Sequence, residues 1–124
     1  NKKVTLQYSV FDVLQCGYPN DFFDAVVFIF AHFPSEIKKK AHKRIQSFLK
    51  PNGKILFEAF TKEQLNYESG GPKEITMLFS EKEIKDEFSE VSFDFINTEI
   101  IKLNEGPYHQ GKGAVIRFLA TKRN

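Results

Sequence analysis

One stretch, Phe23–Gly53, constrains the fold of this 124-residue chain more than any other part of it. It begins with an almost unbroken apolar run, continues with apolar residues at helical spacing, and ends at Asn52-Gly53. A second apolar run, Lys54–Ala59, follows at once. Two buried strands joined by a helix form a βαβ unit, which requires a sheet that is at least partly parallel. The sequence therefore predicts an α/β fold whose ligands gather at the carboxyl ends of these strands.

The connecting helix is expected to begin at Pro34 or Ser35, because proline fits the first helical position and serine caps it. The segment Lys50–Gly53 should end it, since proline cannot continue a helix. One apolar stripe runs along the helix and consists of Ile37, Ala41, Ile45, Phe48 and Leu49. The basic cluster Lys38–Arg44 falls largely on the other face. Without interleaved aromatic residues, this cluster is interpreted as a solvated face rather than a phosphate-binding surface.

The remaining elements follow from local patterns. Ser80 with Glu83 is a capping-box pattern, so a helix is expected over Glu81–Phe88. Strict alternation begins at Val91, and the strand there should pair with the last strand as an antiparallel hairpin. The other predicted segments are a strand at Val4–Phe11, a turn at Leu14–Asp21, a short helix at Thr61–Leu65, a loop at Asn66–Ile75, and the hairpin strands Val91–Leu103 and Ala114–Thr121.

Composition limits the function classes. Eighteen basic and sixteen acidic residues leave a net charge of +2, which gives no general argument for nucleic acid or membrane binding. No apolar run approaches the ~18 residues of a membrane span. The single cysteine, Cys16, excludes an internal disulfide framework and fits a reducing cytoplasm, where the protein is expected. Because the chain opens at Asn1 rather than at Met, it is interpreted as part of a longer protein.

Three polar residues lie at or near the ends of predicted strands. Asp12 follows the first strand, where it is either a ligand's hydrogen-bond acceptor or an ordinary turn residue. His32 follows the central strand and is either a base or substrate orienter facing the cleft, or a histidine bonded to the backbone. Glu58 lies within an apolar strand and must be paired or face a cleft, because burying a lone carboxylate is costly.

The loop Asn104–Gly113 carries Tyr108-His109-Gln110, which are either part of a lid or the tip of a hairpin. The histidines at positions 32, 42 and 109 lack the close spacing of a metal site, so no metal is expected. No nucleophile motif or glycine-rich phosphate loop is recognisable. From the residues alone, the function is limited to small-molecule binding in an α/β cleft.

An ordered set of motifs extends over practically the whole chain. It consists of Phe11-Asp12-Val13, Phe23–Val27 leading to His32-Phe33-Pro34, Leu49–Gly53, Leu56–Phe60, Gly70-Gly71-Pro72 and Glu105–Gly111. In order and spacing, this set resembles the carboxyl-terminal part of class I S-adenosylmethionine-dependent methyltransferases. Within them it is most similar to the tellurite-resistance-type branch.

The resemblance implies a Rossmann-like sheet, mostly parallel with an antiparallel carboxyl-terminal hairpin, that lacks its first two strands. Residues 1–124 would then form a single partial methyltransferase domain. The family's glycine-rich turn and ribose-binding acid have no counterpart here. The implied roles are cofactor contacts for Asp12, Val13, Phe30 and Ala31, a catalytic role for His32, and substrate-side positions for Phe33, Tyr108, His109 and Gln110.

The implied activity is methyl transfer from S-adenosylmethionine to a small acceptor, such as tellurite, a thiol or a metabolite, by the intact protein. The chain alone is expected to be inactive. Deprived of its neighbours, Val4–Phe11 should be displaced, disordered, or exchanged in a homodimer or strand-swapped oligomer. The alternatives are a non-enzymatic α/β binding or dimerisation module and, disfavoured by the terminal hairpin and by the lack of a dinucleotide fingerprint, a nucleotide-dependent oxidoreductase.

Overall fold

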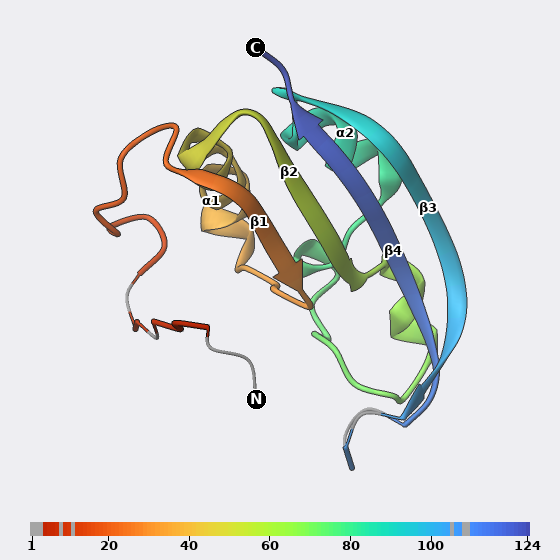
Figure 1. Ribbon diagram of the computed structural model, residues 1–124. Helices are drawn as coiled ribbons and strands as arrows, with labels where there is room; N and C mark the ends of the chain where they lie inside the picture. Colours follow the sequence, from red (N-terminus) through yellow and green to blue (C-terminus); the bar gives the residue numbers. More distant parts are fainter. Residues whose placement is uncertain (1–3, 8, 11, 105, 108–109) are drawn as a thin grey trace.

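A four-stranded sheet forms the centre of the protein in a computed structural model, which describes residues 4–7, 9–10, 12–104, 106–107 and 110–124. The sheet order is β1-β2-β4-β3, and Figure 1 shows helices α1 and α2 together behind it. The strands are β1 (Phe23–Ile29), β2 (Leu49–Phe60), β3 (Val91–Asn104) and β4 (Gln110–Lys122). The helical elements are α1 (Ser35–Phe48), α2 (Glu81–Glu87) and two 3₁₀ turns, η1 (Lys62–Asn66) and η2 (Ile75–Met77).

The strand pairing confirms the predicted α/β class. β1 and β2 are parallel, with Val27 opposite Leu56, and α1 connects them as a βαβ unit. β4 is antiparallel to both β2 and β3, so the predicted carboxyl-terminal hairpin is present. Parallel pairing in the described sheet is limited to β1 and β2. The hairpin strands are longer than expected, because β4 begins at Gln110 rather than at Ala114.

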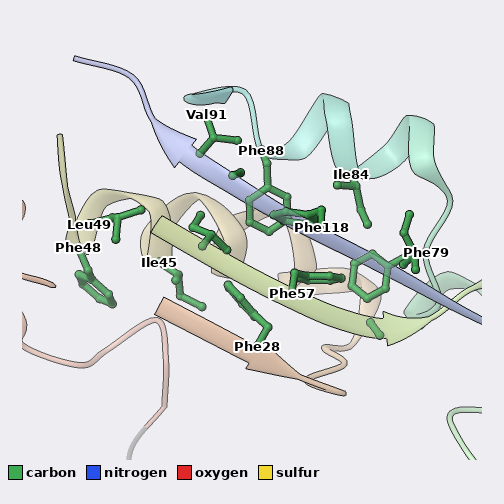
Figure 2. Close-up of a cluster of buried hydrophobic side chains, with 14 of the residues drawn as sticks. Phe28, Ile45, Phe48, Leu49, Phe57, Phe79, Ile84, Phe88, Val91 and Phe118 are labelled. Carbon is green, nitrogen blue, oxygen red and sulfur yellow. The ribbon is translucent and has the colours of Figure 1, made fainter. Parts of the chain in front are cut away.

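Phenylalanine rings fill the space between the sheet and the two helices (Figure 2). Phe57 of β2 and Phe118 of β4 stack with ring centroids 4.7 Å apart, and Phe88 packs edge-on against Phe118 at 5.2 Å. His42 of α1 is fully buried among these rings, and its Nδ1 lies 2.6 Å from Glu87 Oε1 at the end of α2. The core therefore fixes both helices on one face of the sheet.

The opposite face of the sheet carries no helix in the described part of the chain. Four apolar side chains on it are largely exposed: Val27 (55%), Ile29 (68%), Leu56 (47%) and Phe95 (47%). An ion network lies beside them. Arg117 Nε is 2.6 Å from Glu58 Oε2, and its Nη1 is 2.7 Å from Glu99 Oε1. The sequence required the Glu58 carboxylate either to be paired or to face a cleft. It is paired, across the β2–β4 register.

The predicted strand at Val4–Phe11 is wrong for the residues that the structure describes there. None of residues 4–7, 9 and 10 belongs to a strand, and Val4, Leu6 and Val10 are 70%, 68% and 105% exposed. Strands need a partner for their main-chain groups, and no strand of the described sheet pairs with these residues. Displacement of this segment from the sheet was one of the outcomes expected for a strand that lacks its neighbouring strands.

The solvated-face interpretation of the basic cluster on α1 is wrong for Lys38. This side chain is only 4% exposed, because the segment around η2 lies over it. Its Nζ donates hydrogen bonds to Leu78 O (2.7 Å) and Thr76 O (3.2 Å). Lys39 and Lys40 remain exposed as expected. A lysine at this position thus supplies donors for carbonyl groups that η2 leaves unpaired.

Candidate active site

The carboxyl end of β1 carries an unusual backbone conformation at Phe30. Its φ is +50°, which is rare for a bulky residue, and its N–H donates to Glu58 O at 2.7 Å. Such conformations cost about 1–3 kcal/mol and are concentrated at functional sites. The bend ends β1 at Ile29, earlier than the apolar run predicts. The Phe30 ring packs on Phe60 with centroids 4.7 Å apart, whereas Ala31 contributes to a cavity elsewhere.

That cavity, which we call the β1 hollow, has a volume of about 370 Å³. Its walls come from residues 13–18, from β1 with the segment that follows it, and from α1. Val13, Ala31 and Phe33, three residues with implied ligand roles, line it together. Cys16, Tyr18, Phe23 and Phe48 are among its other lining residues. Positions far apart in the chain thus line one hollow that extends along β1, from Phe23 at its start to Ala31 and Phe33 past its carboxyl end.

The turn that forms one wall is fastened to α1. Asp12 Oδ1 accepts a hydrogen bond from Leu14 N–H (2.9 Å), which stabilises the turn locally. Arg44 Nη2 donates to Cys16 O at 2.9 Å, and the Tyr18 ring packs edge-on against Phe23 at 4.8 Å. The helix and the aromatic contacts therefore hold this wall in place.

The hollow is suited to one part of S-adenosylmethionine. Its lining residues are apolar apart from Cys16 and Tyr18, and an apolar, partly aromatic wall favours a flat heteroaromatic ring such as adenine. Among the described lining residues there is no carboxylate for ribose hydroxyls and no charged partner for the methionine end. The residues present therefore fit the adenine end of the cofactor and do not fit the rest.

His32 makes main-chain contacts with both ring nitrogens. Its Nδ1 lies 3.0 Å from Met77 O, and its Nε2 accepts from Phe60 N–H at 3.3 Å. These partners assign the neutral tautomer with the proton on Nδ1. Burial lowers the pKa of His32, and the nearby Lys38 charge lowers it further, against an opposing effect of the Met77 carbonyl. The geometry matches a histidine bonded to the backbone, which was one of the two interpretations of the sequence.

The other residues with implied roles lie apart from the hollow. Asp12 is exposed in its turn and is not a lining residue. Phe30 packs with Phe60 in a second apolar cluster. Gln110 is exposed at the start of β4, where its Nε2 donates to Asn104 Oδ1 and Gly106 O, both at 2.9 Å. Tyr108 and His109 lie outside the described residues.

Sequence reasoning missed a buried hydrogen-bond centre near the carboxyl end of β2. Gln64 of η1 is 1% exposed and accepts from Ala114 N–H at 2.7 Å. Its Nε2 donates to Ser69 Oγ (2.9 Å) and Gly70 O (3.0 Å). No periodic pattern marks this glutamine. Its role depends on three segments that meet only in the folded protein.

Among the described residues, no group of three or more His, Cys, Asp or Glu side chains is arranged to hold a metal ion. No helix in the described part of the chain has the length and apolar character needed to span a membrane.

Comparison with known proteins identifies the fold. No protein-family model matches the sequence, and none of the curated proteins matches it either. Solved structures do match. A SAM-dependent methyltransferase from Methanosarcina mazei superposes with a TM-score of 0.67 at 15% identity, over 93% of this chain and 66% of that one. TehB from Haemophilus influenzae gives 0.64 at 18% identity, over 93% of this chain and 40% of that one.

The N-methyltransferase NodS from Bradyrhizobium japonicum, solved in complex with S-adenosyl-L-homocysteine, is a third match. Its TM-score is 0.62 at 11% identity, over 94% of this chain and 54% of that one. The chain thus spans 40–66% of the length of these three proteins. At such identities the likeness establishes the fold alone. The described elements have the architecture of the corresponding part of SAM-dependent methyltransferases.

Proposed function

We propose that this chain is part of an enzyme that transfers a methyl group from S-adenosylmethionine to a small acceptor. One observation carries the proposal. Val13, Ala31 and Phe33 line one apolar hollow that extends along β1, with Ala31 and Phe33 just past the carboxyl end of that strand, in a chain whose fold is that of SAM-dependent methyltransferases. In open α/β sheets, this end of the strands is where ligands bind.

The residues of this chain would contribute binding and orientation. The hollow would hold the adenine ring by apolar contact and keep water from it. When bound, S-adenosylmethionine supplies an electrophilic methyl carbon. His32 would act as a positioning residue that joins the η2 segment to the end of β2, because both its ring nitrogens already have main-chain partners. Segments beyond this hollow would have to supply polar partners for the ribose and methionine groups.

A titration with S-adenosyl-L-homocysteine, followed by ¹H–¹⁵N NMR, tests the hollow directly. We expect shifts at the amides of Val13, Cys16 and Ala31, with weak affinity, because only one end of the ligand finds partners. The variant Ala31→Phe should fill the hollow and abolish these shifts. Lys40→Phe adds the same ring at an exposed position of α1 and should leave them unchanged. Shifts confined to other regions would contradict the assignment.

Calorimetry with S-adenosylmethionine measures how much of the cofactor site this chain holds. The apolar lining predicts no heat of binding at micromolar ligand concentrations. A micromolar dissociation constant would show that the 124-residue chain holds a complete site, and would overturn the proposal that it is inactive alone.

The candidate methyl acceptors are tellurite, a thiol and a small metabolite. The likeness to TehB, at 18% identity, is the ground for keeping the tellurite-resistance branch among them. The discriminating assay uses the polypeptide encoded by the whole gene, with S-adenosylmethionine carrying a labelled methyl group and each acceptor class in turn. Label transfer to one class identifies the acceptor.

A non-enzymatic binding or dimerisation module is the second candidate function. The uncovered apolar face of the sheet, with Val27 and Ile29 more than half exposed, favours it. Failure of the gene-encoded polypeptide to bind S-adenosyl-L-homocysteine or to transfer label would favour this module over the enzyme.

A further inference from the structure

Two basic side chains bind three successive carbonyl groups at the end of η2. Lys38 Nζ donates to Thr76 O at 3.2 Å and to Leu78 O at 2.7 Å. His32 Nδ1 lies 3.0 Å from the carbonyl between them, Met77 O. Both side chains come from the stretch that follows β1 and enters α1. One short stretch of the chain thus holds another through consecutive main-chain groups.

The ammonium group of Lys38 occupies a buried position with several partners. The residue is 4% exposed, and its Nζ lies 4.2 Å from the centroid of the Phe79 ring and 3.7 Å from Glu83 Oε2. Burial lowers the pKa of Lys38, the carboxylates of Glu83 and Glu87 on α2 raise it, and Lys62 of η1 lowers it further. The two carboxylates therefore support the charged form where burial opposes it.

His32 makes both of its main-chain contacts only with a neutral ring. Its Nε2 accepts the Phe60 N–H through a lone pair, and its Nδ1 then carries the proton that Met77 O accepts. Burial lowers the pKa of His32, and the positive charge of Lys38 lowers it further. Lys38 thus acts on His32 in two ways, through the carbonyl groups that it holds and through its charge.

His32 stands between two residues of the β1 hollow. Ala31 and Phe33 line the hollow, whereas the ring of His32 lies against Phe60 on another side of the same segment. A side chain that is bound at both ring nitrogens also restrains the main chain that carries its two neighbours. The position of the His32 ring therefore affects this wall of the hollow.

We propose that Lys38 is a positioning residue of the candidate site. By holding the carbonyls of Thr76 and Leu78, it directs the Met77 carbonyl between them toward His32. The ring of His32 and the hollow wall on either side of it are set by that contact. The effect on ligand binding rests on the proposed function, whereas the effect on the His32 ring does not.

Ring ¹⁵N signals of His32, in the polypeptide encoded by the whole gene, test the first effect. His32→Phe assigns these signals by their loss. In the unaltered protein at pH 7, the proton should be on Nδ1. Lys38→Met removes both donors and the charge but keeps the apolar length of the side chain. The His32 ring should then populate both neutral tautomers, and its titration midpoint should rise because a like charge is gone.

Lys39→Met is the matched control, because it removes the same charge at an exposed neighbouring position. It should leave the His32 signals unchanged. A loss of stability alone does not alter the tautomer of a histidine in the molecules that remain folded. If Lys38→Met folds and the tautomer and midpoint of His32 stay as they were, the proposal is wrong.

An alkaline titration of the unaltered protein makes the same test without a variant, and serves if Lys38→Met does not fold. Loss of a proton from Lys38 removes the charge near His32 and one of three donors. The ¹⁵N signals of Lys38 Nζ and of the His32 ring should move with a common midpoint. Burial lowers the pKa of Lys38, so that midpoint should lie below 10.5. Ring signals that stay fixed while Lys38 titrates would overturn the proposal.

Calorimetry with S-adenosyl-L-homocysteine tests the effect on the hollow in the same polypeptide. Lys38→Met should weaken binding at least about fivefold, and Lys39→Met should leave it unchanged. If the unaltered polypeptide does not bind this ligand, the proposed function fails, while the ring signals still decide the role of Lys38. If the ring signals move and the affinity does not, the connection from His32 to the hollow wall is wrong.

Discussion

The ring of His32 lies nearly parallel to the ring of Phe60, with 14° between the planes and 5.7 Å between the centroids. The same histidine accepts the hydrogen bond of the Phe60 N–H. Phe30 packs on the Phe60 ring as well, at 4.7 Å, and Gly71 approaches its edge. Phe60 therefore gathers the ends of β1 and β2 and the loop after η1 around one aromatic ring.

We expect His32→Phe to destabilise the protein in a pH-dependent way. The substitution keeps an aromatic ring against Phe60 but leaves Phe60 N–H and Met77 O unpaired, which costs about 1–3 kcal/mol. The pKa of His32 in the folded protein lies below its ordinary value of 6.5. As pH falls below that value, the unfolded state takes up the proton first, so the stability from neutral His32 is complete above pH 6.5 and is lost below it.

Urea unfolding of both proteins at several pH values between 5 and 8 measures this effect. The stability difference between the unaltered chain and His32→Phe should be largest at the alkaline end and shrink toward the acidic end. A difference that is constant or grows with acidity would rule out the neutral tautomer.

Gly71→Ala should cost more stability than Gly106→Ala. Both glycines have left-handed backbones, with φ of +86° and +89°, so both substitutions carry a similar backbone strain of about 1 kcal/mol. A Cβ at Gly71 would lie 2.8 Å from Phe60 Cδ2, whereas nothing lies within 4 Å at Gly106. Thermal unfolding of the pair isolates the steric contribution. Equal losses of stability in the two variants would show that the Phe60 ring moves aside at little cost.

Gln64→Met should loosen the contact between η1 and β4. The change leaves the Ala114 N–H without its acceptor and Gly70 O without its donor, and a loss of about 2–4 kcal/mol is expected for two unpaired buried groups. Hydrogen exchange should become faster at the Ala114 amide in particular. Glu63→Met alters the exposed neighbour in η1 and should change stability by less than about 0.5 kcal/mol.

Lys38→Met tests the buried lysine of α1. Methionine keeps the apolar length of the side chain and removes the ammonium group that holds Thr76 O and Leu78 O. We expect a loss of about 1–3 kcal/mol, measured by urea unfolding. Lys39→Met, at an exposed neighbouring position, is the matched control and should be nearly neutral. Equal effects of the two changes would contradict a structural role for Lys38.

Local patterns were sufficient for most elements of the fold. The βαβ unit over Phe23–Gly53 and the stretch that follows, the helix after Ser80 and the terminal hairpin all appear where periodicity and capping place them. Ser80 Oγ accepts from Glu83 N–H at 3.2 Å, as the capping pattern predicts. Such signals depend on neighbours a few residues apart, so a sequence displays them directly.

Only part of the candidate site could be predicted from the sequence in the same way. Val13, Ala31 and Phe33 do meet in one hollow, but Phe30 turns to the opposite side because its backbone has positive φ. No residue pattern predicts a positive φ at a phenylalanine. The contacts of His32 depend on Met77, which is 45 positions away. Only the folded geometry therefore decides between the two interpretations of His32.

The sequence by itself determined the order and type of the four strands and of helices α1 and α2, because helix and strand periodicity are local properties of the chain. Tertiary structure alone decided what the polar residues do. Lys38, Gln64 and Glu58 all carry polar groups that burial or strand register brings to specific partners. It also decided that residues 4–7, 9 and 10 lie outside the sheet, since a strand forms only where another main chain offers its hydrogen bonds.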